Sequence, residues 1–108
     1  MERIAMETRL PRIPSDYLAR SADVIKCLGH PLRLRLLEAL ESGERTVSEL
    51  QEYAGVSQAT VSQQLGILRG RGVVDFRRDG IYVYYWITEP KVAHILACIR
   101  GCADPESA

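Results

Sequence analysis

The chain has 108 residues, 46% of them apolar, and its 14 basic and 14 acidic side chains give a formal net charge of zero. This length suits a single domain with a small core, and the absence of an 18-residue apolar run or a leader-like segment argues against a membrane span and secretion. The net charge excludes a strongly basic protein, although residues 57–87 contain four arginines against two aspartates.

A flexible arm and two helices are predicted at the start of the chain. Residues 1–15 carry arginines and prolines that favour an arm, and helices are expected over residues 16–28 and 31–41. Pro31 suits the first position of the second helix, because an amide hydrogen there would have no helical partner. A loop containing Gly43 is expected to follow.

Two short helices joined by a tight turn are predicted over residues 46–68. Thr46 and Glu49 have the spacing of a capping box, in which the Thr46 hydroxyl accepts the Glu49 amide hydrogen and the Glu49 carboxylate accepts the Thr46 amide hydrogen. Gly55 suits the left-handed residue that ends a helix, and Ser57 can cap the next helix. This spacing is that of a helix-turn-helix.

The second helix of this pair has one apolar face and one uncharged polar face. Val61, Leu65 and Leu68 recur at helical spacing on the apolar face. The polar face, which also includes Gln64, carries amides and hydroxyls that can bond base edges or phosphates, and an alanine that can touch a thymine methyl. The predicted DNA-contacting residues on this helix are Gln58, Ala59, Thr60, Ser62 and Gln63. An ordinary amphipathic surface helix is the alternative interpretation.

A β-hairpin wing is predicted over residues 73–87. Its two runs of β-branched and aromatic residues are separated by Asp79-Gly80, which we expect to form the two-residue turn because such turns need positive φ. Arg77 and Arg78 lie beside the tip, where a guanidinium can pair with phosphate or enter a minor groove. Both are predicted DNA contacts, the alternative being two solvent-exposed arginines without a partner.

A final helix over residues 89–100 and a short acidic tail over residues 103–108 complete the predicted elements. The expected fold is mainly α with a β-hairpin wing (α+β), with the element order helix, helix, helix, helix, strand, strand, helix. We expect a single winged helix-turn-helix domain over residues 16–102.

Three segments of the chain resemble the ArsR/SmtB family of bacterial winged helix-turn-helix repressors. They are residues 30–37 (HPLRLRLL), 56–65 (VSQATVSQQL) and 79–85 (DGIYVYY), and the likeness extends over roughly residues 16–102. The resemblance implies a homodimer, joined through the first and last helices, that binds a double-stranded DNA operator of its own operon and leaves when an inducer binds. The positions that match the family's DNA contacts are Gln58, Ala59, Ser62 and Gln63, with Arg77 and Arg78 near the wing.

The three cysteines are candidates for sensing the inducer. We expect a cytoplasmic protein, whose thiols stay reduced and form no structural disulfide. Cys98 and Cys102 are one helical turn apart in the last helix, with His94 one turn before Cys98. If the first and last helices pack together as in the family, Cys27 lies in the same layer.

Converging thiolates favour a soft metal or metalloid such as arsenic(III) or cadmium. The predicted sensing residues are Cys27, Cys98 and Cys102, with His94 as a weaker candidate. No resident cofactor is expected. A redox or persulfide link, for which Cys27 with a last-helix cysteine is the better pair, is an alternative, and so are inert, buried cysteines.

The chain departs from the family at the family's known effector sites. Residues 45–50 lack the thiols that many of its metalloid sensors have there, and the last helix keeps only fragments of the zinc and nickel sites, so zinc is less favoured than a softer ion. Glu38 occupies the position at which the persulfide and redox sensors have a cysteine.

Two other functional classes remain to be weighed. An enzyme is not expected, because the chain has no Cys-x-x-Cys motif, phosphate-binding glycine loop or Ser/His/Asp set. A protein-interaction module and a constitutive repressor are further alternatives. Binding to DNA weakens steeply with added salt, whereas binding through an apolar protein interface does not.

Overall fold

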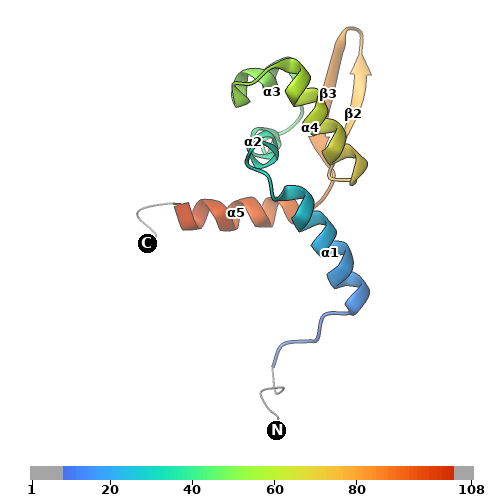
Figure 1. Ribbon diagram of the computed structural model, residues 1–108, viewed down its shortest axis with the longest axis vertical. Helices are drawn as coiled ribbons and strands as arrows, with labels where there is room; N and C mark the ends of the chain where they lie inside the picture. Colours follow the sequence, from blue (N-terminus) through green and yellow to red (C-terminus); the bar gives the residue numbers. More distant parts are fainter. Residues whose placement is uncertain (1–8, 104–108) are drawn as a thin grey trace.

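The order of the predicted elements is confirmed, and one short strand is added. The computed structural model describes residues 9–103. Its elements are α1 (Ser15–Leu28), α2 (Pro31–Leu40), β1 (Arg45–Thr46), α3 (Val47–Ala54), α4 (Gln58–Gly70), β2 (Val74–Asp79), β3 (Tyr82–Ile87) and α5 (Lys91–Ala103). Figure 1 shows α3, α4 and the hairpin at one end of the molecule and α1 and α5 at the other. The fold is the expected α+β winged helix-turn-helix.

The sheet has three antiparallel strands in the order β1-β3-β2, one more than the hairpin alone provides. The added strand has only two residues, and its Thr46 pairs with Tyr84 of β3. The segment that begins the helix-turn-helix is therefore hydrogen-bonded directly to the wing.

The hairpin turn lies one residue later than predicted. Strand β2 continues through Asp79, which pairs with Tyr82, so the two loop residues are Gly80 and Ile81 rather than Asp79-Gly80. Gly80 has φ of 64°, and no residue other than glycine has a positive φ in the described chain. A two-residue loop with glycine at its first position needs only one left-handed residue, which explains the shift.

The helix ends lie within three residues of the predicted ones, and the end of α1 and the start of α2 agree with them. Helix α5 covers Lys91–Ala103 instead of residues 89–100, since the Glu89 carboxylate accepts the Lys91 amide hydrogen at 3.0 Å and the helix continues across Gly101. Of the predicted arm, residues 1–8 lie outside the described chain, as does the predicted tail beyond Ala103. Between Arg9 and Pro14 there is no helix or strand.

The core lies beneath the helix-turn-helix. Leu50 of α3 and Leu65 and Leu68 of α4 have no exposed surface, and α2 contributes the equally buried Leu36 and Leu37. Full burial of such a side chain contributes about 1.5–3 kcal/mol. This packing fixes α4 with its polar face outward.

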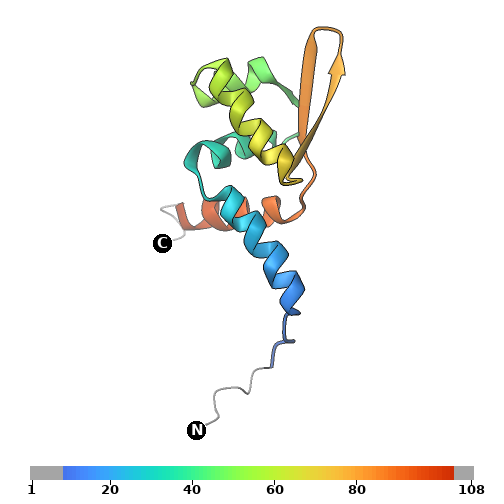
Figure 2. The same ribbon diagram turned by 45° about the vertical axis from the view of Figure 1, so that its right-hand side comes forward.

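The terminal helices bury less of their apolar surface. Helix α1 contributes Val24, Cys27 and Leu28 to the core, yet Leu18 and Ile25 on the same helix are 51% and 59% exposed. Both views show α1 extending away from the helix-turn-helix (Figures 1 and 2). No helix within residues 9–103 is both long and apolar enough to span a lipid bilayer.

Candidate nucleic-acid interface

The capping box that begins α3 is formed as predicted. The Thr46 hydroxyl accepts the Glu49 amide hydrogen at 3.1 Å, and the Glu49 carboxylate accepts the Thr46 amide hydrogen at 2.8 Å. At the other end of α3, Gly55 has the left-handed conformation, with φ of 71°. These two ends fix the length of α3 and the turn that leads into α4.

Ser57 caps α4, also as predicted. Its hydroxyl accepts the Thr60 amide hydrogen at 3.2 Å and lies 2.9 Å from the Thr60 hydroxyl. Thr60 is half-buried and its hydroxyl is engaged with the cap, so its predicted role in contacting DNA would require that hydroxyl to share its hydrogen bond.

The rest of the predicted recognition surface is open. Gln58, Ala59, Ser62 and Gln63 are exposed on α4. Within residues 9–103, none of these side chains is held in a hydrogen bond or ion pair. Gln64 differs, because its side-chain oxygen accepts a hydrogen bond from Arg33 at 2.8 Å. The amides left free for a base edge are thus those of Gln58 and Gln63.

A hollow of about 260 Å³ separates this face of α4 from the wing. Gln58 and Ser62 line it from α4, and Arg78 lines it from β2. In Figure 2 the hairpin stands beside α4, so that a single ligand can touch both. The sequence predictions missed further lining residues, which are Thr46, Val47, Ser48, Phe76, Ile81, Tyr82, Val83 and Tyr85.

Ile81 is the most exposed of the missed residues. It is 90% exposed at the tip of the wing, directly after Gly80. An apolar side chain in this position suits contact with sugars and base edges in a minor groove. The sequence prediction missed Ile81 because it placed the turn one residue earlier, which assigns Ile81 to the second strand of the hairpin.

Arg77 and Arg78 point to opposite faces of the hairpin. They pair with Tyr84 and Val83 of β3, and neighbouring residues of a strand alternate in direction. Arg77 is 2.9 Å from the Glu44 carboxylate and lies 4.5 Å over the ring of Tyr84. Arg78 has no ion-pair partner within residues 9–103, lies 5.8 Å from the centre of the Phe76 ring, and lines the hollow beside α4. Of the two, Arg78 has the freer guanidinium.

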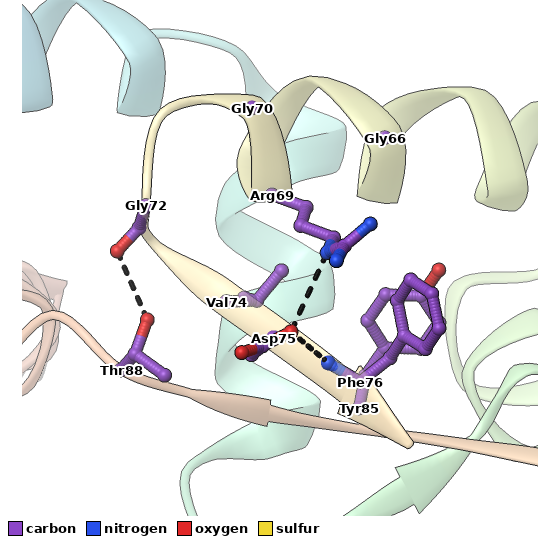
Figure 3. A pocket seen from close by; sticks show the side chains of 9 residues that line it. All are labelled: Gly66, Arg69, Gly70, Gly72, Val74, Asp75, Phe76, Tyr85 and Thr88. Atoms are coloured by element: carbon purple, nitrogen blue, oxygen red, sulfur yellow. Dashed lines mark hydrogen bonds and ion pairs between the residues drawn. The ribbon is translucent and has the colours of Figure 1, made fainter. Parts of the chain in front are cut away.

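The base of the wing is fastened to the end of α4 (Figure 3). Arg69 lies 4.2 Å over the Phe76 ring and 3.4 Å from the Asp75 carboxylate, and the rings of Phe76 and Tyr85 are 5.4 Å apart. Burial raises the pKa of Tyr85, against the opposing effect of Arg69 and Arg78. A cation over an aromatic ring contributes about 0.5–1 kcal/mol at exposed sites, so these contacts hold the wing in place.

A second hollow, of about 650 Å³, lies beside these contacts. Figure 3 shows it bordered by Gly66 and Gly70 of α4, whose missing side chains leave that side of the helix open. The polar side chains in its walls are already engaged, Arg69 with Asp75 and Thr88 with the Gly72 carbonyl. We therefore place the DNA-reading surface at the first hollow, near the start of α4.

The three cysteines occupy different environments. Cys27 is buried in the last turn of α1, whereas Cys98 and Cys102 are exposed, one turn apart, on α5. His94, also exposed, precedes Cys98 by one turn. Within residues 9–103 of a single chain, no three His, Cys, Asp or Glu side chains are grouped closely enough to hold a metal ion. The structure thus brings together two of the predicted thiols.

The remaining histidine has a structural role. His30 caps α2, its Nδ1 atom accepting the Leu32 amide hydrogen at 3.2 Å, followed by Pro31 at the first helical position. Both observations agree with the predicted helix start.

Comparisons with known proteins agree with this geometry. Residues 30–75 match the family described as bacterial regulatory proteins of the arsR family. The biofilm growth-associated repressor of Xylella fastidiosa is 44% identical over 89 residues, which cover 81% of this chain and 78% of that protein. The probable mercury resistance operon repressor of Streptomyces lividans is 36% identical, and the match covers 89% of this chain and 77% of the relative.

A solved structure shares the fold. It is the solution structure of a homodimeric winged helix-turn-helix DNA-binding domain from Mycobacterium bovis, with 34% identity, a TM-score of 0.71 and 85% coverage of each chain. That domain is described as a possible ArsR-family transcriptional regulator. This chain therefore belongs to the arsR family of bacterial regulatory proteins and is a transcriptional repressor rather than an enzyme.

Proposed function

We propose that two copies of this chain form a homodimer through α1 and α5 and repress their own operon by binding a double-stranded operator. The observation that carries this proposal is the open amide and hydroxyl face of α4 beside Arg78, which has no ion-pair partner within residues 9–103. Such a face suits base edges, and a guanidinium beside it suits phosphate. Gln58, Ala59, Ser62 and Gln63 are the proposed base-reading residues, with Thr60 and Arg77 in lesser roles.

The terminal helices support the dimer. Ile25 of α1 and Ile99 of α5 are 59% and 44% exposed, and a partner would bury them. The solved relative from Mycobacterium bovis is homodimeric. Two recognition helices that read half-sites must be spaced by about one turn of DNA, so any change at the dimer interface alters the fit to the operator.

We further propose that a soft metal or metalloid releases the repressor by binding Cys98 and Cys102. Two exposed thiols one turn apart can reach one ion, and thiolates favour soft ions such as arsenic(III) and cadmium over hard cations. The relative that is named for mercury resistance supports a thiophilic effector. Cys27 and His94 are secondary candidates, because Cys27 is buried at the end of α1 and His94 lies one turn before Cys98 on α5.

The effector would act on the dimer rather than on the DNA-reading surface. Cys98 and Cys102 lie on a helix proposed to join the two copies, at the opposite end of the molecule from α3 and α4 (Figure 1). A coupling of about 1–3 kcal/mol already changes affinity about 5- to 150-fold. In the bacterial cytoplasm, where thiols stay reduced, both cysteines would be available to the ion.

The test is fluorescence anisotropy of the reduced protein on a duplex from its own upstream region, titrated with arsenite, cadmium and a persulfide donor. We expect the protein to bind this duplex specifically and arsenite or cadmium to release it. The double variant Cys98→Ser/Cys102→Ser should bind the same duplex and remain bound in the presence of the ion. Release of the double variant at the same concentration would remove these thiols from sensing.

A matched control separates the redox alternative from metal binding. Cys27→Ser leaves both exposed thiols in place, so it should keep its response to arsenite or cadmium. Loss of the response in Cys27→Ser, together with release of the wild type by the persulfide donor alone, would favour a link between Cys27 and α5. A protein that binds no specific duplex would contradict the repressor itself.

A further inference from the structure

Arg33 joins three helices through a single guanidinium. The residue lies on α2, where its Nε atom donates to the side-chain oxygen of Gln64 on α4 at 2.8 Å. Its Nη1 atom donates to the backbone carbonyl of Cys27 on α1 at 2.9 Å. Both bonds are partly buried, so water competes for them less than at an open surface.

The bond to α1 is made at the end of that helix. Cys27 lies in the last turn of α1, where backbone carbonyls lack helical partners and the helix dipole is negative. A cation is favoured at such a position, and hydrogen bonds from a charged donor are about twice as strong as neutral ones. Arg33 therefore fixes the end of α1 from a neighbouring helix.

The bond to α4 is made on the recognition helix itself. Gln64 follows Gln63 directly but is half-buried and turned toward α2. Among side-chain hydrogen bonds of residues 9–103, the bond between Arg33 and Gln64 is the one that joins α4 to either α1 or α2. The buried leucines of the two helices share the core, and their packing is less directional than this hydrogen bond.

We infer that Arg33 is a positioning residue for operator binding, which makes the placement of the recognition helix depend on the end of α1. This inference rests on the proposed function, in which α4 reads DNA and α1 joins the dimer. It adds a route between the two regions that does not pass through α5 or its cysteines. A shift of α1 displaces Arg33 through the first hydrogen bond, and Arg33 displaces Gln64 through the second. Gln64 is next to the proposed base-reading Gln63.

The inference has a reciprocal consequence. Coupling between two sites acts equally in both directions. If the end of α1 influences DNA binding through Arg33, then bound DNA holds the end of α1 in place. The buried Cys27 thiol reports on this directly, because it reacts with a thiol reagent only when the end of α1 opens.

The experiment measures how operator DNA changes the reactivity of Cys27. In the full-length Cys98→Ser/Cys102→Ser variant, Cys27 is the only thiol, and its thiolate can be followed as it displaces thionitrobenzoate from a disulfide reagent. We expect saturating operator to slow this reaction at least about 5-fold, the lower end of typical coupling. With Arg33→Met added, the thiol should react faster, and operator should no longer slow it.

Two further variants make the test specific to the bond. Gln64→Leu removes the acceptor and should abolish the operator effect, whereas Gln64→Glu keeps an acceptor and should retain it. Arg35→Met is the matched control, because Arg35 is exposed on the same helix and its side-chain partners, Glu38 of α2 and Tyr53 of α3, lie on neither α1 nor α4. It should behave like the parent.

Each outcome bears on the inference. Protection of Cys27 by operator that persists in both Arg33→Met and Gln64→Leu would overturn it, as would a parent that binds operator without protecting Cys27. A parent that binds no operator contradicts the proposed function instead. Should Arg33→Met fail to fold, Gln64→Leu alone decides the question.

Discussion

The two ends of the molecule differ in how completely a single chain buries their apolar side chains. At the DNA-reading end, the helix ends are capped, and Leu50, Leu65 and Leu68 have no exposed surface. At the other end, α1 and α5 leave Leu18, Ile25 and Ile99 substantially exposed. The reading end presents the polar face of α4 together with Ile81 at the wing tip, and the terminal end presents apolar helix faces. The first suits DNA and the second suits another copy of the chain.

This contrast separates DNA reading, which a single chain provides, from dimer formation, which needs a second copy. The chain builds one complete reading unit, and the distance between two such units is left to an interface that the single chain does not form. Regulation can then act on the interface without disturbing the folded reading unit. Substitutions in the terminal helices should change operator affinity most, and substitutions in the reading unit should change it less.

The largest effect is expected from Ile25→Glu. A carboxylate on the exposed apolar face of α1 should prevent the dimer while leaving the buried face of α1 intact. Losing the second reading unit removes the gain of bivalent binding, which is about 10²- to 10⁴-fold. Analytical ultracentrifugation measures the association state, and anisotropy measures the operator affinity. Ala19→Glu, also on an exposed part of α1, is the control and should remain dimeric.

Gln63→Ala should lower operator affinity next in order. A bidentate contact to a base contributes about 1–3 kcal/mol of discrimination, so the loss is about 5- to 150-fold. The side chain has no partner within the described chain, so the melting temperature should stay the same. Binding to an unrelated duplex serves as the control and should change little. Unchanged affinity for the operator would refute the role assigned to Gln63.

Arg78→Met and Arg77→Met should differ in their salt dependence. Arg78 has no ion-pair partner in the described chain and lines the hollow beside α4, so its loss should lower the slope of affinity against salt by about one phosphate contact per protomer. Arg77 is held by Glu44 and Tyr84, so its replacement should leave that slope unchanged. Equal slopes for the two variants would show that the hairpin faces do not divide the arginines in this way.

The smallest effect on operator affinity is expected from Gly55→Ala. The left-handed φ of 71° at the turn is costly for alanine, by about 1–2 kcal/mol, so the free energy of unfolding should fall by that amount. Operator affinity should stay close to that of the wild type, since the folded turn keeps its form. Gly66→Ala is the control, because that glycine is helical with nothing within 4 Å of the added carbon, and it should raise stability slightly. Chemical denaturation measures both.

The sequence predicted best those features that depend on residues three or four apart. The capping box of Thr46 and Glu49, the left-handed Gly55 and the cap at Ser57 are all set by local bonds, and all are confirmed. The turn was misplaced by one residue, because Asp79-Gly80 and Gly80-Ile81 both offer a glycine to a two-residue loop.

The features that sequence could not supply depend on distant partners. Strand β1 has only two residues and exists because β3 pairs with it across the fold. Gln64 belongs by spacing to the open polar face, yet Arg33, 31 residues earlier, engages it. The separation of Arg77 from Arg78 follows from strand alternation and was within reach of the sequence.

The two-residue strand has a further consequence for how the protein moves. Thr46 both caps α3 and pairs with Tyr84 of the wing. A wing that swung freely on its own hinge would have to break this pairing and disturb the first turn of α3. The amide hydrogens of that turn and of β3 should therefore exchange with solvent together, as one cooperative unit. The wing is then a rigid extension of the helix-turn-helix, and it has its DNA-binding conformation before it contacts DNA.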